Sequence, residues 1–162
     1  MAFELLNRNV DQPYKYVAIW LIGEWSKIGL HVKQRVEPMG PESAAMRSSN
    51  FDVLLEANCN SVVNPLLDVQ KFLPHTVYVG NYGNYDDQAE IDLYQKLLRE
   101  MDAAKRRVLM RDLEKLVLDN EAHEMVVTYW HRIVPLRSYV KGWKVGPSDY
   151  LNQDLANIWL DK

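Results

Sequence analysis

The chain has 162 residues, of which 48% are hydrophobic and 25% are charged, and this composition suits one globular domain with its own core. Its net charge is −3, from 19 basic and 22 acidic residues mixed along the sequence, which argues against a nucleic-acid partner. The single cysteine, Cys59, excludes an intrachain disulfide and a multi-cysteine zinc site. The longest apolar run, Val17 to Gly23, is too short to span a bilayer.

The first part of the chain predicts a strand, a helix and a second strand. The strands are residues 3–7 and 30–36, and a Pro13-started helix runs between them to about Ile28. Gly29 is well placed for a left-handed helix end. Four apolar residues recur at helical spacing and predict the inward face of this helix: Val17, Leu21, Trp25 and Ile28. This βαβ unit predicts parallel strands joined by a right-handed crossover. Because a strand starts near Met1, we interpret the chain as a piece of a longer protein, so the missing secretory signal is uninformative about its destination.

A third strand and a polar loop follow a short helix at residues 41–48. The segment FDVLLEA, residues 51–57, is apolar enough for a strand covered on both faces. The loop from Asn58 to Asn64 is rich in Asn and Ser, and Asn64 can cap a helix that starts at Pro65. Open α/β sheets bind ligands beyond the carboxyl ends of their strands, so this loop is a candidate ligand-facing segment. The alternative is that its Asn residues only form turns.

The remainder predicts more helix and a tail without a clear pattern. A short helix is expected at residues 65–72, a loop at 74–87, helices at 87–101 and 102–120, and a strand at 124–134. The inward faces of the two long helices are predicted to be Ile91, Tyr94, Leu97, Leu98 and Met101 in the first, and Leu109, Leu113, Leu116 and Val117 in the second. The tail carries Trp143, Tyr150 and Trp159 without a period that would bury them.

Motifs of cofactor and catalytic chemistry are absent from the sequence. It has no Gly-rich phosphate loop, no G-x-S-x-G elbow and no H-E-x-x-H pair, and its four His residues are scattered. We therefore predict no cofactor, no metal and no enzymatic activity. The alternative is a small α/β enzyme or an interaction domain that uses the Asn58–Asn64 loop, with Cys59 or His131 as the reactive group.

The order of motifs resembles a known family. The pieces are FELLNRN before a Pro-started helix, then WSKIGLHVKQRVEP, SSNFDVLLEA, NYGNYDDQAEIDLYQKLL, MDAAKRRVLMRDLEKLV and VKGWKVGP. Together they resemble the C-terminal lobe of the solute-binding proteins of ABC importers, in the extracytoplasmic family 5 group of dipeptide, oligopeptide and nickel binders. Each piece is weakly specific, and their order and spacing over nearly the whole chain carry the likeness.

This resemblance implies an α/β fold, one lobe of a type II periplasmic-binding-protein fold, with a mostly parallel sheet flanked by helices. Residues 1–162 would form a single domain cut from a two-lobed periplasmic receptor, with the tail at 136–162 belonging partly with the missing N-terminal lobe. The whole receptor would capture a peptide-like, sugar-like or opine-like solute and deliver it to the membrane permease of an ABC importer.

The resemblance also implies that this lobe carries half of the solute cleft. Peptide binders of the family typically hold the peptide amino terminus with an acidic residue in the loop that corresponds to Asn58–Asn64, which has no carboxylate here. With Arg8 and Arg132 as the nearest charges, we expect a neutral or anionic solute. The candidate ligand-binding residues are Asn7, Arg8, Asn58, Asn60, Tyr82, Tyr129, Trp130 and Arg132.

Overall fold

The computed structural model describes residues 1–58, 62, 64–129, 133–146 and 155–161. The chain divides into two compact units. The larger unit comprises Met1–Ala57 and Val69–Met125, and the smaller comprises Asn58–Asp68 and Val126–Lys162. The single domain expected over residues 1–162 stays a prediction. None of the helices in the described ranges is long and apolar enough to cross a membrane.

A three-stranded parallel sheet lies in the larger unit. Its strands are β1 (Ala2–Arg8), β2 (His31–Glu37) and β3 (Val53–Leu55), in the order β2-β1-β3. This confirms the predicted α/β fold with three neighbouring parallel strands. The third strand is shorter than the predicted residues 51–57, because only Val53–Leu55 pair with a neighbouring strand, opposite Leu5–Asn7 of β1.

The central strand β1 is covered on both faces. Leu5, Leu6 and Asn7 are all buried, and successive side chains of a strand point to opposite faces. On one face the Phe3 ring lies 5.7 Å from the ring of Trp25 in α1 (Tyr16–Ser26). On the other, Arg8 contacts α2 (Met39–Arg47) through a salt bridge. The two helices therefore pack on opposite sides of β1, as expected for right-handed crossovers that run in opposite directions across a sheet.

The first crossover helix follows the prediction over most of its length. A π-helical turn, η1 (Asp11–Lys15), leads into α1, and Gly29 has the left-handed φ of +84° expected after the helix end. Leu21 is buried, whereas Val17 and Trp25 are half-buried. The prediction that Ile28 is core was wrong, because α1 ends at Ser26 and leaves Ile28 74% exposed.

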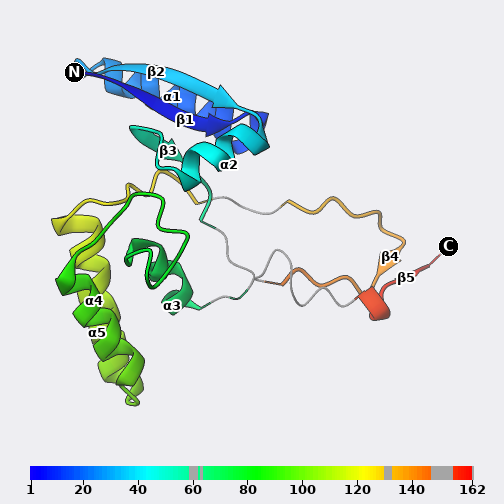
Figure 1. Cartoon of the computed structure of the whole chain (residues 1–162). Coiled ribbons are helices and arrows are strands. Elements are labelled where there is room, and N and C mark those ends of the chain that lie inside the picture. Colours follow the sequence, from blue (N-terminus) through cyan, green and yellow to red (C-terminus); the bar gives the residue numbers. More distant parts are fainter. Residues whose placement is uncertain (59–61, 63, 130–132, 147–154, 162) are drawn as a thin grey trace. The chain divides into compact units, whose positions relative to one another are not determined.

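Two long helices form an adjacent pair (Figure 1): α4 (Gln88–Arg99) and α5 (Ala103–Lys115), which continues as the π-helical turn η3 (Leu116–Asn120). Both start next to the predicted position, at the N-caps Asp87 and Asp102, whose side chains accept backbone hydrogen bonds from the first turn. The inward face of α5 and η3 is confirmed, with Leu113 and Val117 buried and Leu109 and Leu116 half-buried. In α4 the predicted face was too wide, because Leu98 and Met101 are exposed and Glu90 is buried beside Tyr94 and Leu97.

The segment between the sheet and α4 is a short helical stretch followed by a loop. Helix α3 (Pro65–Asp68) begins at the predicted proline, and the side chain of Asn64 accepts a hydrogen bond from the backbone N–H of Leu66 at 3.1 Å. The 3-10 turn η2 (Val69–Phe72) follows. In the loop, the buried Asn81 side chain accepts a hydrogen bond from the backbone N–H of Tyr85 and donates one to the carbonyl oxygen of the same residue. These two hydrogen bonds fix the turn.

The predicted strand at residues 124–134 was wrong for the residues that the structure describes. Residues 124–129 and 133–134 have no strand pairing, and Met125, Val126 and Ile133 are exposed. The local composition favours a strand, but a strand also needs a neighbour for its backbone hydrogen bonds. None of the described strands supplies one.

The smaller unit contains an antiparallel pair of short strands, β4 (Val140–Lys141) and β5 (Trp159–Leu160), with the 3-10 turn η4 (Leu155–Asn157) before β5. The sequence pattern did not predict this ribbon. Gly142, with φ of +78°, lies so close to the carbonyl of Asn157 that a side chain would collide with it.

Candidate functional site

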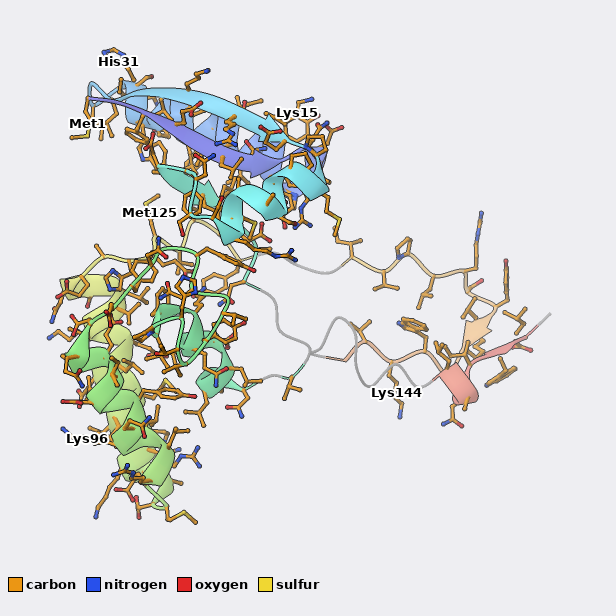
Figure 2. The ribbon with its side chains drawn as sticks, viewed as in Figure 1. Met1, Lys15, His31, Lys96, Met125 and Lys144 are labelled. Atoms are coloured by element: carbon orange, nitrogen blue, oxygen red, sulfur yellow. The ribbon has the colours of Figure 1, made fainter. Side chains whose placement is uncertain are left out.

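The carboxyl ends of β1 and β3 meet at one edge of the sheet. In Figure 2, Met1 and His31 lie at the opposite end of the sheet from Lys15, whose turn η1 leaves this carboxyl edge. The Asn7↔Leu55 pair is the last of the β1–β3 register, so the next residues, Arg8 and Glu56, come side by side. This edge is where an open α/β sheet binds ligands.

The buried side chain of Asn7 stabilises the carboxyl end of β1 by hydrogen bonding. Its side chain is fully buried, its amide nitrogen donates to the carbonyl of Arg8 at 2.9 Å, and its amide oxygen accepts from Gln34 at 3.0 Å. A buried amide needs such partners, since an unpaired one destabilises the fold. The structure thus gives Asn7 a structural role in joining β1 to β2, and its predicted contact with solute stays a prediction.

Arg8 is the centre of a charged cluster. Its Nε lies 3.0 Å from Oε2 of the fully buried Glu42, and its Nη2 lies 3.7 Å from Oε1 of Glu56. Its guanidinium stands 5.3 Å from the centre of the Tyr14 ring, and the Tyr14 hydroxyl donates to Glu56 Oε1 at 3.3 Å. We call these four residues the Arg8 cluster.

The electrostatics of the Arg8 cluster are those of a partly buried ion network. The hydrogen bond to Glu42 raises the pKa of Arg8 above its ordinary value, with a smaller contribution from the Glu56 charge. Burial raises the pKa of the Glu56 carboxyl, although the Arg8 charge acts in the opposite direction. Arg8 is therefore a cation paired with two carboxylates, which the expectation of Arg8 and Arg132 as the nearest charges did not include.

The other predicted site residues are dispersed. Tyr82, in the larger unit, is half-buried, and its carbonyl accepts a hydrogen bond from the Ser49 hydroxyl at 2.7 Å. Asn58 and Tyr129 are exposed and belong to the smaller unit. Asn60, Trp130 and Arg132 lie outside the described residues. Of the predicted residues that the structure describes within the larger unit, it brings Asn7 and Arg8 together.

Three residues of the Arg8 cluster were missed by sequence reasoning: Tyr14, Glu42 and Glu56. Glu56 had a signal, because it is the single charged residue in the C-terminal half of the apolar FDVLLEA segment. Glu42 and Tyr14 had none, since each is an ordinary residue of a predicted helix. Only the parallel pairing of β1 with β3 and the packing of α2 bring them to Arg8.

No group of three or more His, Cys, Asp or Glu side chains that could hold a metal ion occurs within the part of the chain that the structure describes. The Arg8 cluster offers two carboxylates and a phenol, but the guanidinium between them occupies the place that a cation would need. Its chemistry is charge pairing and hydrogen bonding.

No protein-family model matches the sequence, and no curated protein matches it significantly. Solved structures do match. The periplasmic binding protein DppA of an ABC transporter from Helicobacter pylori, in complex with the peptide STSA, aligns with a TM-score of 0.81 and 18% identity, over 99% of this chain and 31% of that one. The chain has the fold of one lobe of a periplasmic binding protein.

Two further structures share the fold of this lobe. The murein tripeptide binding protein MppA of Escherichia coli aligns with a TM-score of 0.69 and 17% identity, over 75% of this chain and 24% of that one. The periplasmic binding protein MelB of Agrobacterium fabrum, in complex with stachyose, aligns with a TM-score of 0.63 and 21% identity, over 75% and 20%. The lobe thus spans less than a third of the length of each of these three structures.

Proposed function

We propose that this chain is one lobe of the solute-binding component of an ABC importer. The observation that carries the proposal is the match to DppA over 99% of the chain, in which the fold extends from the first strand through the tail. DppA itself is described as an ABC transporter-associated periplasmic binding protein. The order and spacing of the sequence motifs support the same assignment.

The proposed activity is binding without turnover. The solute is peptide-like, sugar-like or opine-like, since the structures with this fold include complexes with a peptide, with stachyose and, in the protein AgaA, with agropinic acid. The Arg8 cluster lies where such a sheet presents ligand contacts, and it contains no nucleophile paired with a base. The partners are the solute, a second lobe and the permease of the importer, and the proposed location is the periplasm.

A lobe by itself supplies half of a cleft. Small-molecule sites normally bury most of the ligand surface, so the isolated chain is expected to bind solute weakly. The test is calorimetry on a two-lobed protein that contains this chain, with a panel of di- and tripeptides, oligosaccharides and opine-like acids. Saturable binding of one class without chemical change of the ligand supports the proposal. Absence of binding across the panel, or conversion of a ligand, contradicts it.

Within that panel, Asn58→Ala and Asn60→Ala test the predicted loop contacts. Each substitution removes an amide that is proposed to hydrogen-bond the solute, and the expected loss of affinity is about 5- to 20-fold per residue. Unchanged affinity in both variants would show that the loop does not contact the solute, while the transport role of the lobe would stand.

A further inference from the structure

Positive charge is concentrated where α4 and α5 are joined (Figure 1). Residues 96–111, which we call the basic segment, hold six basic and two acidic residues, a net charge of +4 (6 − 2) in a chain whose net charge is −3. The six basic side chains are all exposed: Lys96, Arg99, Lys105, Arg106, Arg107 and Arg111. The rest of the chain is therefore acidic, and the basic segment has the opposite sign.

The cations of the basic segment lack counter-ions within the described residues. None of the six side chains forms an ion pair or a hydrogen bond with another residue that the structure describes. The two acidic residues of the segment bond to the backbone instead. Glu100 Oε1 accepts from the backbone N–H of Asp102 at 2.8 Å, and the Asp102 carboxylate caps α5. The positive charge of the segment therefore stays available to an external partner.

Apolar side chains are exposed among these cations. Met101 lies between the C-cap of α4, Glu100, and the N-cap of α5, Asp102, and it is 90% exposed. Leu98 and Val108, on the two helices that flank the turn, are also exposed. Exposed apolar side chains that are rimmed by polar ones mark interaction surfaces. The partner must therefore be anionic and must also accept an apolar side chain.

A shallow groove lies beside the turn. It has a volume of about 390 Å³, and its walls come from both helices: Lys96, Arg99, Glu100 and Leu109. Figure 2 shows Lys96 on α4. Two cations and one apolar wall suit a phosphate group that carries an apolar chain, because the guanidinium and ammonium groups bind phosphate oxygens and the leucine contacts hydrocarbon.

From this surface we infer that the basic segment binds the surface of an anionic phospholipid bilayer. Its Lys and Arg side chains contact lipid phosphates, and Met101 enters the interfacial layer between the headgroups. The inference goes beyond the proposed function, because it concerns the membrane in which the permease lies rather than the solute. It does not depend on the Arg8 cluster or on which solute is bound.

A bilayer fits this surface better than an acidic protein or a nucleic acid. A folded protein would need carboxylates at fixed places, and ordering six long side chains against them loses rotamer freedom. Lipid headgroups move laterally and adapt to the cations. A nucleic acid offers phosphates but accepts an apolar side chain only by unstacking its bases. Basic residues combined with exposed apolar ones are typical of helices that lie at a membrane interface.

The test is co-sedimentation of the full 162-residue chain with vesicles. One set of vesicles is an equimolar mixture of phosphatidylglycerol and phosphatidylcholine, and the other is phosphatidylcholine alone. We expect binding to the anionic vesicles that is at least about tenfold tighter and that weakens as salt is added. The triple variant Lys105→Gln/Arg106→Gln/Arg107→Gln should lose about 100-fold, since each cation near an anionic surface contributes about fivefold. Glutamine keeps the helix propensity of these positions.

The matched control removes the same charge from other exposed lysines of the larger unit: Lys15→Gln/Lys27→Gln/Lys33→Gln. Each of these lysines already pairs with a carboxylate of the chain. This variant should therefore bind the anionic vesicles within about twofold of the unaltered chain. Met101→Ser should weaken binding by about fivefold, because it removes the apolar side chain that enters the bilayer. Circular dichroism establishes that each variant is folded.

Three results would overturn the inference. The first is equal binding to anionic and neutral vesicles, or no binding to either. The second is an equal loss in the two triple variants, which would show an effect of net charge alone. The third is undiminished binding by Met101→Ser together with equally tight binding of sodium polyglutamate, which would show a surface for any polyanion. None of these results bears on the proposed function, which calorimetry with solutes tests separately.

Discussion

Oε1 of Glu90 lies 2.9 Å from Nε2 of His123, joining the first turn of α4 to the segment that follows η3. The Glu90 side chain is almost fully buried, and the His123 ring stacks on Tyr85 at 4.0 Å between ring centres. The Tyr85 hydroxyl donates to the carbonyl of His123 at 2.7 Å. The contact is a close approach and not a hydrogen bond, because Oε1 of Glu90 and Nε2 of His123 are both buried without a hydrogen-bond partner among the described residues.

Burial moves the pKa of each group in the direction that favours its neutral form. Burial, followed by the charges of Asp87 and Glu121, raises the pKa of Glu90 to about 7 from 4.5. Burial lowers the pKa of His123 below 6.5, against the opposing charges of Glu121 and Asp87. Because the pKa of Glu90 is higher in the folded chain than in the unfolded one, its protonated carboxyl stabilises the fold. This contribution to the free energy of unfolding is complete below pH 4.5 and is lost as pH rises through about 7. The lowered His123 pKa acts oppositely, losing stability as pH falls below 6.5.

Glu90→Gln isolates the carboxyl contribution. The free energy of unfolding of the unaltered chain, minus that of the variant, should fall by about 1–3 kcal/mol as pH rises from about 4.5 to about 7. Urea melts across this range give the difference directly. Asp92→Asn, which alters an exposed aspartate of the same helix, serves as the control. A difference that does not change with pH would show that Glu90 titrates normally.

Core packing of α1 is tested by one buried and one exposed position. Leu21 is buried under the sheet, so Leu21→Ala should reduce the free energy of unfolding by about 2–5 kcal/mol. Ile28 lies two residues beyond the end of the helix and is 74% exposed, so Ile28→Ala should change it by less than about 0.5 kcal/mol. Denaturant melts measure both. Equal effects of the two substitutions would contradict the burial of α1.

The start of α5 depends on one cap. The Asp102 carboxylate accepts hydrogen bonds from the backbone N–H groups of Ala104 and Lys105, each at 2.9 Å. Asp102→Ala should lower the free energy of unfolding by about 0.5–2 kcal/mol. Asp102→Asn keeps a capping oxygen and should lower it by less than about 0.5 kcal/mol. Thermal unfolding of the two variants compares them. Indistinguishable variants would mean that the cap contributes through charge alone.

The tail should promote self-association. Trp159 is 56% exposed in β5, and Trp143 is half-buried with its indole nitrogen enclosed but without a hydrogen-bond partner among the described residues; Tyr150 lies outside them. Exposed apolar surface of this kind favours contact with another copy when the second lobe is missing. Sedimentation velocity should show association that grows with concentration, and Trp159→Ser should reduce it. A strictly monomeric chain at high concentration would disprove the prediction.

The sequence predicted those features that depend on local patterns. Four features follow from residue type and spacing along a few turns: strand β1, the cap at Asp102, the left-handed Gly29 and the proline-started α3. That the three strands are parallel neighbours was also predicted, because short crossovers leave few topologies, whereas their order β2-β1-β3 was not. The same ordered motifs led to the periplasmic-binding-protein fold.

The tertiary structure alone decided the candidate site. Arg8, Tyr14, Glu42 and Glu56 span 49 positions of the sequence (56 − 8 + 1). They meet because β3 pairs with β1 and because α2 packs against β1. Conversely, residues 124–134 have the composition of a strand but no partner among the described strands. Local propensity is a property of a segment, whereas pairing, burial and charge compensation belong to contacts between segments distant in sequence.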